Sequence, residues 1–193
     1  MQSYWLLLII LILIACSSSG SKYPLVEIRT ELGDIEIELY DDKAPKSVAA
    51  FLANVDAGLY NDAHFYRVLN NENQPSNAPK SEVIQGGIWR KRNKPDTIPS
   101  IPHEPTNQTG LSHTNGVISF ARMEPGTAGS EFFICLGDQP GYDYGGENNP
   151  DGQGYAAFGK VIKGMDVVMK IYNRPERDQY FDPPVNIYSI RKL

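Results

Sequence analysis

Short segments that alternate apolar and polar residues recur along most of this 193-residue chain, and they restrict its possible folds more than any other feature. Leu25 to Thr30 and Ile35 to Tyr40 alternate in this way, and Leu32-Gly33-Asp34 between them predicts the turn of a β-hairpin. Six further strands are predicted: Phe65 to Leu69, Val83 to Trp89, Gly116 to Arg122, Glu131 to Leu136, Tyr155 to Val161 and Val185 to Ile190. So many short strands favour a closed antiparallel barrel or a sandwich, and their periodicity alone does not choose between the two.

Only two segments have the spacing of a helix. The first lies between Pro45 and Gly58, with the proline near its first turn and the glycine past its last one. The second is Met165 to Tyr172. A parallel α/β sheet needs a helix between most pairs of strands, so this class of fold is excluded.

The composition is that of one domain with a single core, because hydrophobic residues make up 41% of the chain. The formal net charge is −5, and the basic residues are scattered except for a cluster at positions 90 to 94, which we interpret as a solvated loop. Nucleic acid is therefore not expected as a partner. Cys135 lies within an apolar run and is expected to be a buried small hydrophobe and not a catalytic thiol.

Three patterns suggest other kinds of site, but their flanking sequence or spacing does not support those sites. Residues 152–157 have the letters G-x-G-x-x-A of a dinucleotide-binding loop, but they lead into a predicted strand and not into a helix. The oxygen-rich stretch 143–151 is broken by Gly and Pro, which indicates a tight loop and not a calcium site. The three histidines lack metal-ligand spacing, and no Gly-x-Ser-x-Gly motif is present. Metalloenzyme and hydrolase functions find no support, and no metal is expected.

The beginning of the chain differs from the rest. Trp5 to Ala15 is an unbroken apolar run, shorter than the roughly twenty residues of a membrane-spanning helix, so residues 1–15 are predicted to be a signal peptide. Leu13 to Cys16 resembles the lipobox of bacterial lipoproteins, in which the cysteine is lipidated and becomes N-terminal after cleavage. We therefore predict a lipidated Cys16 with a flexible tether over residues 16–24, followed by one domain over residues 25–193. An anchor that is never cleaved is the alternative.

Three separate blocks of the chain resemble a known family. They are Phe65 to Leu69 (FYRVL), Val83 to Gly87 (VIQGG) and Gly129 to Ile134 (GSEFFI). They resemble the F-H-R-V-I, Q-G-G and G-S-Q-F-F-I blocks of the cyclophilins, the cyclosporin-binding class of peptidyl-prolyl cis/trans isomerases. The resemblance runs from Leu25 to Leu193 in family order. It implies a mainly β fold, an eight-stranded antiparallel closed β-barrel capped by two α-helices.

The resemblance also implies a site. Arg67 would be the main catalytic group, and Gln85 would orient the peptide carbonyl next to the target proline. The other residues expected to contact the substrate are Phe65, Val83, Ala121, Arg122, Glu131, Phe133, Tyr142 and Tyr155. Phe133 would form the floor of the proline pocket, whereas Phe65 fits the barrel core better than direct contact. Rotation about a prolyl bond forms and breaks no covalent bond, so no cofactor is expected.

The chain departs from the family pattern around this site. The segment before Val83 is longer, which predicts an inserted loop at the edge of the groove. Glu82 and Val83 replace a Phe-Met pair. Glu131 falls where many members carry a glutamine, and Tyr155 where many carry a histidine. These differences predict a pocket that is shallower or more polar than usual, which bears on turnover and sequence preference.

The sequence predicts a monomeric peptidyl-prolyl isomerase that acts on proline-containing segments of unfolded or folding envelope proteins. Its lipid anchor would hold it to a membrane outside the cytoplasm of a bacterium, in the periplasm or at the cell surface. The alternative is a non-catalytic proline-peptide binding or chaperone module on the same fold. The presence of Arg67 favours the enzyme, whereas Glu82, Glu131 and the inserted loop favour the alternative. A purely structural lipoprotein would not need Arg67, Gln85 and Phe133 together.

Overall fold

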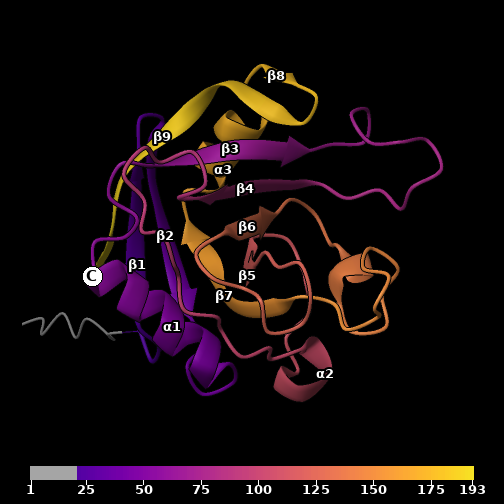
Figure 1. The fold of residues 1–193 in the computed structure, drawn as a ribbon, viewed down its shortest axis with the longest axis horizontal. Helices are drawn as coiled ribbons and strands as arrows, with labels where there is room; N and C mark the ends of the chain where they lie inside the picture. Colours follow the sequence, from indigo (N-terminus) through magenta and orange to yellow (C-terminus); the bar gives the residue numbers. More distant parts are fainter. Residues whose placement is uncertain (1–20) are drawn as a thin grey trace, which may run out of the picture.

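The structure, a computed structural model, describes residues 21–193 and shows eight antiparallel strands that close into a barrel (Figure 1). The strands of the barrel are β1 (Leu25–Thr30), β2 (Gly33–Leu39), β3 (Ala63–Leu69), β4 (Val83–Gly87), β5 (Val117–Phe120), β6 (Phe132–Cys135), β7 (Ala156–Lys163) and β9 (Tyr180–Lys192). Their order is β1-β2-β7-β5-β6-β4-β3-β9, and the pairing of β9 with β1 closes the barrel. The two-residue β8 (Glu176–Arg177) pairs with the start of β9. The predicted eight-stranded barrel is confirmed.

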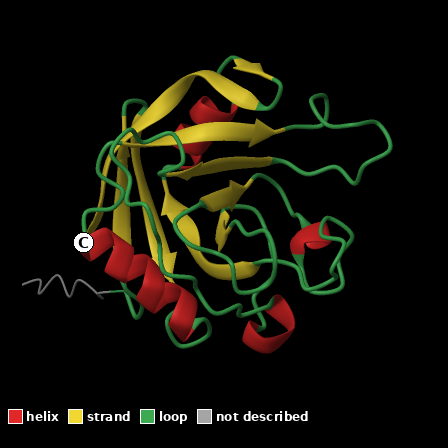
Figure 2. Ribbon diagram, viewed as in Figure 1, coloured by secondary structure: helices red, strands yellow, loops and turns green. Residues whose placement is uncertain are grey.

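The helices lie outside the barrel (Figure 2). The two predicted ones are α1 (Pro45–Asp56), which packs over β7 and β9, and α3 (Met165–Tyr172), which packs over β2 and β4. Two further single turns are α2 (Thr106–Thr109) and the 3-10 helix η1 (Pro140–Tyr142). The sequence does not predict them, because so few residues carry no helical periodicity.

The start of α1 is capped from a distant part of the chain. Its N-cap residue, Ala44, has no side chain that could accept a hydrogen bond. The carboxylate of Glu104 instead accepts hydrogen bonds from the backbone N–H of Lys46 at 3.2 Å and of Ser47 at 2.7 Å. A negative charge at the N-terminus of a helix also interacts favourably with the helix dipole. Glu104 therefore fixes α1 against the loop that precedes α2.

The apolar side chains form two clusters on the two faces of the barrel wall. Inside the barrel, the ring of Phe51 from α1 lies 5.1 Å from that of Phe158 and 6.0 Å from that of Phe132. The smaller cluster consists of Val83, Phe133, Cys135 and Tyr142. Because side chains alternate along a strand, β4 and β6 contribute to both clusters. The barrel wall thus presents an apolar patch on its outer face, and Cys135 is buried there as predicted.

β9 is longer than the predicted strand, which begins only at Val185. The alternation is interrupted by Pro183 and Pro184, which cannot donate a backbone hydrogen bond. In the structure these prolines lie where β9 has no partner in β3, because the pairing passes from Phe65 opposite Val185 to Arg67 opposite Tyr180. The strand therefore continues past a segment that the sequence pattern marks as its end.

Residues 21–24, predicted to be the end of a flexible tether, lie against the barrel. The ring of Tyr23 meets that of Tyr40 edge-on at 5.2 Å, and the carbonyl of Pro24 accepts a hydrogen bond from the backbone N–H of Leu39 at 2.9 Å. The predicted signal peptide and Cys16 lie outside the described residues. Within residues 21–193, no helix is long and apolar enough to cross a membrane.

Candidate active site

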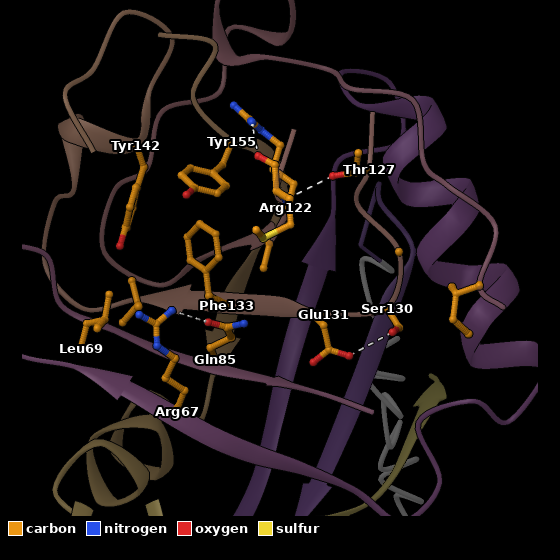
Figure 3. A pocket seen from close by; sticks show the side chains of 15 residues that line it. Arg67, Leu69, Gln85, Arg122, Thr127, Ser130, Glu131, Phe133, Tyr142 and Tyr155 are labelled. Carbon is orange, nitrogen blue, oxygen red and sulfur yellow. Dashed lines mark hydrogen bonds between the residues drawn. The ribbon is translucent and has the colours of Figure 1, made fainter. Parts of the chain in front are cut away.

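A pocket with a volume of about 420 Å³ lies on the outer face of β3, β4 and β6. Of the predicted site residues, the structure brings together Arg67, Gln85, Val83, Ala121, Arg122, Glu131, Phe133, Tyr142 and Tyr155 (Figure 3). Residues that sequence reasoning did not select also line it, among them Leu69, Ile98 and Met123. The pocket therefore combines side chains from three neighbouring strands with loops that follow β5 and precede β7.

Phe65 is the predicted site residue that does not line the pocket. Its side chain is fully buried inside the barrel, with its ring 5.8 Å from that of Phe132. The reason is a bulge in β3, where Phe65 pairs with Gly86 and Arg67 with Gln85, so that Tyr66 is the extra residue. Without a bulge, residues two apart would share a face. The bulge sends Phe65 inward and lets Arg67 point out into the pocket.

The side chains of Arg67 and Gln85 meet at the edge of the pocket. They lie opposite each other on β3 and β4, and Nη1 of Arg67 donates a hydrogen bond to Oε1 of Gln85 at 3.2 Å. Nε2 of Gln85 donates to the hydroxyl of Tyr66 at 2.7 Å, which fixes the orientation of the amide. Oε1 of Gln179 accepts from Nε of Arg67 at 3.3 Å and from Nη2 at 2.7 Å. Sequence reasoning identified neither Tyr66 nor Gln179.

Three aromatic rings form the apolar part of the pocket. The ring of Phe133 lies 5.1 Å from that of Tyr142 and 5.4 Å from that of Tyr155. Figure 3 shows Arg67 and Gln85 on one side of the Phe133 ring and the two tyrosines on the other. Burial raises the pKa of Tyr142 to about 12 and also raises the pKa of Tyr155, so both phenols are neutral at physiological pH. The aromatic part of the pocket therefore carries no charge.

The buried imidazole of His113 packs against the ring of Phe133. The His113 ring stacks on Phe133 with a centroid distance of 5.9 Å. His113 Nδ1 lies 2.7 Å from Oδ1 of Asp143, and its Nε2 lies 3.0 Å from Oγ of Ser119. The order Asp-His-Ser is that of a hydrolase triad, but Ser119 is fully buried and cannot meet a substrate. These residues therefore hold the pocket floor and have no role as a nucleophilic group.

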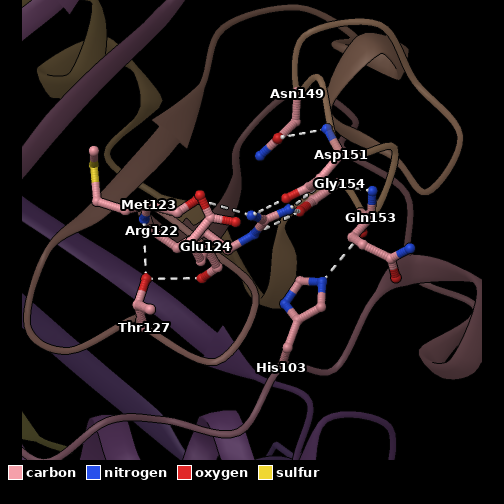
Figure 4. A network of polar contacts seen from close by, with 9 residues as sticks. All are labelled: His103, Arg122, Met123, Glu124, Thr127, Asn149, Asp151, Gln153 and Gly154. Atoms are coloured by element: carbon pink, nitrogen blue, oxygen red, sulfur yellow. Dashed lines mark hydrogen bonds and ion pairs between the residues drawn. The ribbon is translucent and has the colours of Figure 1, made fainter.

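Arg122 lines the pocket, but its guanidinium is occupied by the loop before β7. It donates two hydrogen bonds to the carboxylate of Asp151, at 2.7 and 2.9 Å, two to the carbonyl of Gly154, at 2.9 and 2.5 Å, and one to the carbonyl of Met123 at 3.0 Å (Figure 4). It also lies 5.2 Å from the ring centre of Tyr155. The pairing with Arg122 lowers the pKa of Asp151 to about 2. Arg122 thus fixes Tyr155 and its loop as one wall of the pocket.

Glu131 places a carboxylate at the other end of the pocket. Its Oε1 accepts hydrogen bonds from the backbone N–H of Ile88 and from Oγ of Ser130, both at 3.0 Å. Its Oε2 is buried and has no hydrogen-bond partner among the described residues. Burial raises the pKa of this carboxyl. The carboxylate packs on Gly87, where a Cβ would collide with it, which accounts for one of the two glycines after Gln85.

The β3–β4 loop (residues 70–82) joins two residues that line the pocket, Leu69 and Val83. It is folded on itself, since Nε2 of Gln74 donates hydrogen bonds to the carbonyls of Asn70 and Ser81 at 2.6 and 2.8 Å. The hydroxyl of Tyr142 donates to Oγ of Ser81 at 2.6 Å. The predicted inserted loop is therefore connected both to the aromatic wall and to the strand that carries Arg67.

The chain is similar in sequence to known proteins over most of its length. Residues 25–192 match the family described as cyclophilin type peptidyl-prolyl cis-trans isomerase/CLD. The chain is 40% identical to a peptidyl-prolyl cis-trans isomerase of Acinetobacter baylyi, over 82% of this chain and 77% of that protein. It is 38% identical to peptidyl-prolyl cis-trans isomerase B of Escherichia coli, over 76% of this chain and 83% of that protein.

A solved structure with a similar fold comes from Cryptosporidium parvum. It is a cyclophilin type peptidyl-prolyl cis-trans isomerase whose crystal structure was determined in the presence of the dipeptide Ala-Pro. The TM-score is 0.67 at 25% sequence identity, and the match covers 86% of this chain and 96% of that one.

Proposed function

Because this chain belongs to the cyclophilin-type peptidyl-prolyl cis-trans isomerases and is itself such an isomerase, we propose that Arg67 is its catalytic group and that Gln85 orients the substrate. The observation that carries this proposal is the position of the Arg67 guanidinium. It lies beside the uncharged aromatic part of the pocket, hydrogen-bonded to Gln85 on the neighbouring strand. The pocket would hold the proline ring on Phe133.

The reaction requires a group that stabilises a twisted amide. Rotation about an Xaa-Pro bond breaks the resonance of the amide, with a barrier of about 18–20 kcal/mol. In the twisted state the proline nitrogen becomes pyramidal, and its lone pair can accept a hydrogen bond. A permanently charged guanidinium aimed at this nitrogen stabilises the transition state more than the planar ground state. Arg67 therefore needs only to be held at the correct place.

The contribution of one hydrogen bond from Arg67 determines how much of the rate increase must come from the rest of the pocket. One hydrogen bond to a charged group contributes about 1.5–3 kcal/mol, which corresponds to a rate increase of roughly ten- to 150-fold. Larger acceleration would come from removing water from the amide and from fixing the flanking residues. The neutral Phe133, Tyr142 and Tyr155 rings suit the first task. Gln85 suits the second, because its amide is oriented by two hydrogen bonds before substrate arrives.

We further propose that the substrates are proline-containing segments of unfolded or folding envelope proteins, reached by a lipid-anchored monomer outside the cytoplasm. The support for this location is the sequence of residues 1–16, with its apolar run followed by Cys16. The support for the substrate class is the Ala-Pro dipeptide named with the Cryptosporidium parvum structure.

Exchange NMR on a short Ala-Pro peptide, with and without the domain, tests the function directly. An isomerase makes the cis and trans signals exchange faster at substoichiometric protein, whereas a binding module only shifts or broadens them in proportion to the bound fraction. We expect faster exchange. Binding without faster exchange would instead support the alternative of a non-catalytic proline-peptide module.

A further inference from the structure

The guanidinium of Arg67 is held by a residue from the far end of the chain. Oε1 of Gln179 accepts hydrogen bonds from both Nε and Nη2 of Arg67, at 3.3 and 2.7 Å. A third N–H of Arg67 donates to Gln85. Of the five N–H donors of an arginine, these three hydrogen bonds leave two for a substrate. Gln179 thus determines which edge of the guanidinium faces the pocket.

The backbone of Gln179 is unusual for a residue with a side chain. Its φ is 73°, and that of the preceding Asp178 is 52°, both in the left-handed region that favours glycine. Two hydrogen bonds hold this turn: the carbonyl of Gln179 accepts from the backbone N–H of Val68 at 2.8 Å, and its N–H donates to Oε2 of Glu176 at 2.7 Å. A glycine would adopt this backbone with less strain. The conformation therefore does not explain the glutamine, but its side-chain contacts do.

The β3–β4 loop fixes the amide of Gln179 in one orientation. Nε2 of Gln179 donates a hydrogen bond to the carbonyl of Asn73 at 3.1 Å. A carbonyl can only accept, so the NH₂ group of Gln179 must face Asn73 and its oxygen must face Arg67. Asn73 is itself fixed, because its Nδ2 donates to the carbonyl of Val68 at 3.1 Å and its Oδ1 accepts from the N–H of Asn70 at 3.0 Å. A chain of hydrogen bonds thus connects the loop to the guanidinium.

We propose that Gln179 is a positioning residue for the isomerase reaction and that the β3–β4 loop, through the carbonyl of Asn73, keeps it in the productive orientation. The inference rests on the proposed role of Arg67. Gln179 acts through Arg67 and touches no substrate. Its loss should therefore lower kcat far more than it changes KM.

The left-handed backbone of Gln179 permits a variant that removes the side chain without straining the turn. Gln179→Gly removes the side chain and suits the left-handed backbone, so the domain should keep or gain thermal stability. Its kcat should nevertheless fall about tenfold, the effect of losing a hydrogen bond to a charged group, while KM changes less than about twofold. Gln179→Glu keeps an oxygen toward Arg67 but loses the donor to the Asn73 carbonyl, so it should recover only part of the lost rate, at least about threefold. Gln108→Ala, at an exposed position on α2, is the matched control.

The measurements are exchange NMR over a range of Ala-Pro peptide concentrations, thermal unfolding, and the ¹⁵N–¹H signal of Arg67 Nε. This signal should shift in Gln179→Gly and stay near its wild-type position in Gln179→Glu. A wild-type kcat in a folded Gln179→Gly domain, or no recovery in Gln179→Glu, would overturn the inference. Arg67→Ala separates the two claims: if it loses activity while Gln179→Gly does not, only the positioning role of Gln179 fails.

Discussion

Among single residues, Glu131 has the most unusual surroundings in the pocket. Its carboxylate lies at the end away from Arg67, and only one of its oxygens has hydrogen-bond partners among the described residues. A buried carboxylate with a free oxygen is costly when ionised, and burial raises its pKa accordingly. The G-S-Q-F-F-I block that this segment resembles has a glutamine here, whereas this chain has a glutamate.

We expect Glu131→Gln to raise stability at neutral pH. The folded state binds the Glu131 proton more tightly than the unfolded chain does. The stability of the wild type therefore falls as pH rises from the ordinary value of 4.5 through the raised pKa of the folded state. The glutamine variant lacks this loss, so its advantage should be largest at pH 7 and should shrink toward pH 4.5. Urea unfolding across this range measures it.

Glu124→Gln, at an exposed position in the loop after β5, controls for the change in net charge. An advantage of Glu131→Gln that is the same at every pH would show that the carboxyl does not titrate abnormally. A less stable glutamine variant would show that the unpaired oxygen has a partner that the structure does not reveal.

Among the elements, the β3–β4 loop has the closest connection to the chemistry. Ser81 at its end accepts a hydrogen bond from Tyr142, and Asn73 near its start holds Gln179. The loop extends away from the barrel in Figure 1, and the strands before and after it pair directly, Leu69 with Val83. It therefore contributes to the site without being part of the barrel core.

Removing residues 71–80 should leave the barrel folded and slow the reaction. A surface loop contributes little closure entropy, so the free energy of unfolding should change by no more than about 1 kcal/mol. The rate should fall about as much as in Gln179→Gly, because the carbonyl of Asn73 is lost. Circular dichroism and exchange NMR on the deletion variant test both points. Loss of folding would mean that the loop belongs to the core, and an unchanged rate would mean that the loop does not act on Arg67.

Elements differ in how much of them the sequence predicts. The bounds of β1 and α3 follow from local periodicity, and both are as predicted. The inward turn of Phe65 depends on a bulge that the alternation of β3 does not reveal. The contributions of His113 and Gln179 depend on which strands become neighbours when the barrel closes. Local patterns and a family resemblance locate Arg67, Gln85 and Phe133, but not the side chains that hold them.

For the whole molecule, the arrangement of strands separates the entry of the chain from the pocket. The chain enters the barrel at β1, and in the strand order β6 lies four places from β1 in either direction. The pocket lies over β6, β4 and β3. With the proposed lipid on Cys16, the domain would be tethered through β1, four strands from the β6 part of the pocket.

Cys16→Ser tests the proposed anchor. If lipid on this cysteine holds the protein to a membrane, the variant should move from the detergent phase to the aqueous phase in a phase-partition assay. Ser17→Ala, which keeps the cysteine, should stay with the detergent. A mature wild-type protein that retains residues 1–15 would contradict the assignment, because a lipidated cysteine is N-terminal after cleavage.

The account depends most on Arg67, and its substitution is the most direct measurement. In exchange NMR on an Ala-Pro peptide, Arg67→Ala should lower kcat/KM at least about tenfold, the effect of one charge-assisted hydrogen bond. Arg67→Lys should not restore it, because an ammonium group cannot donate to Gln85, Gln179 and the prolyl nitrogen in the geometry of a planar guanidinium. The circular dichroism spectra of both variants should match that of the wild type. A wild-type rate in a correctly folded Arg67→Ala domain would contradict the proposed mechanism.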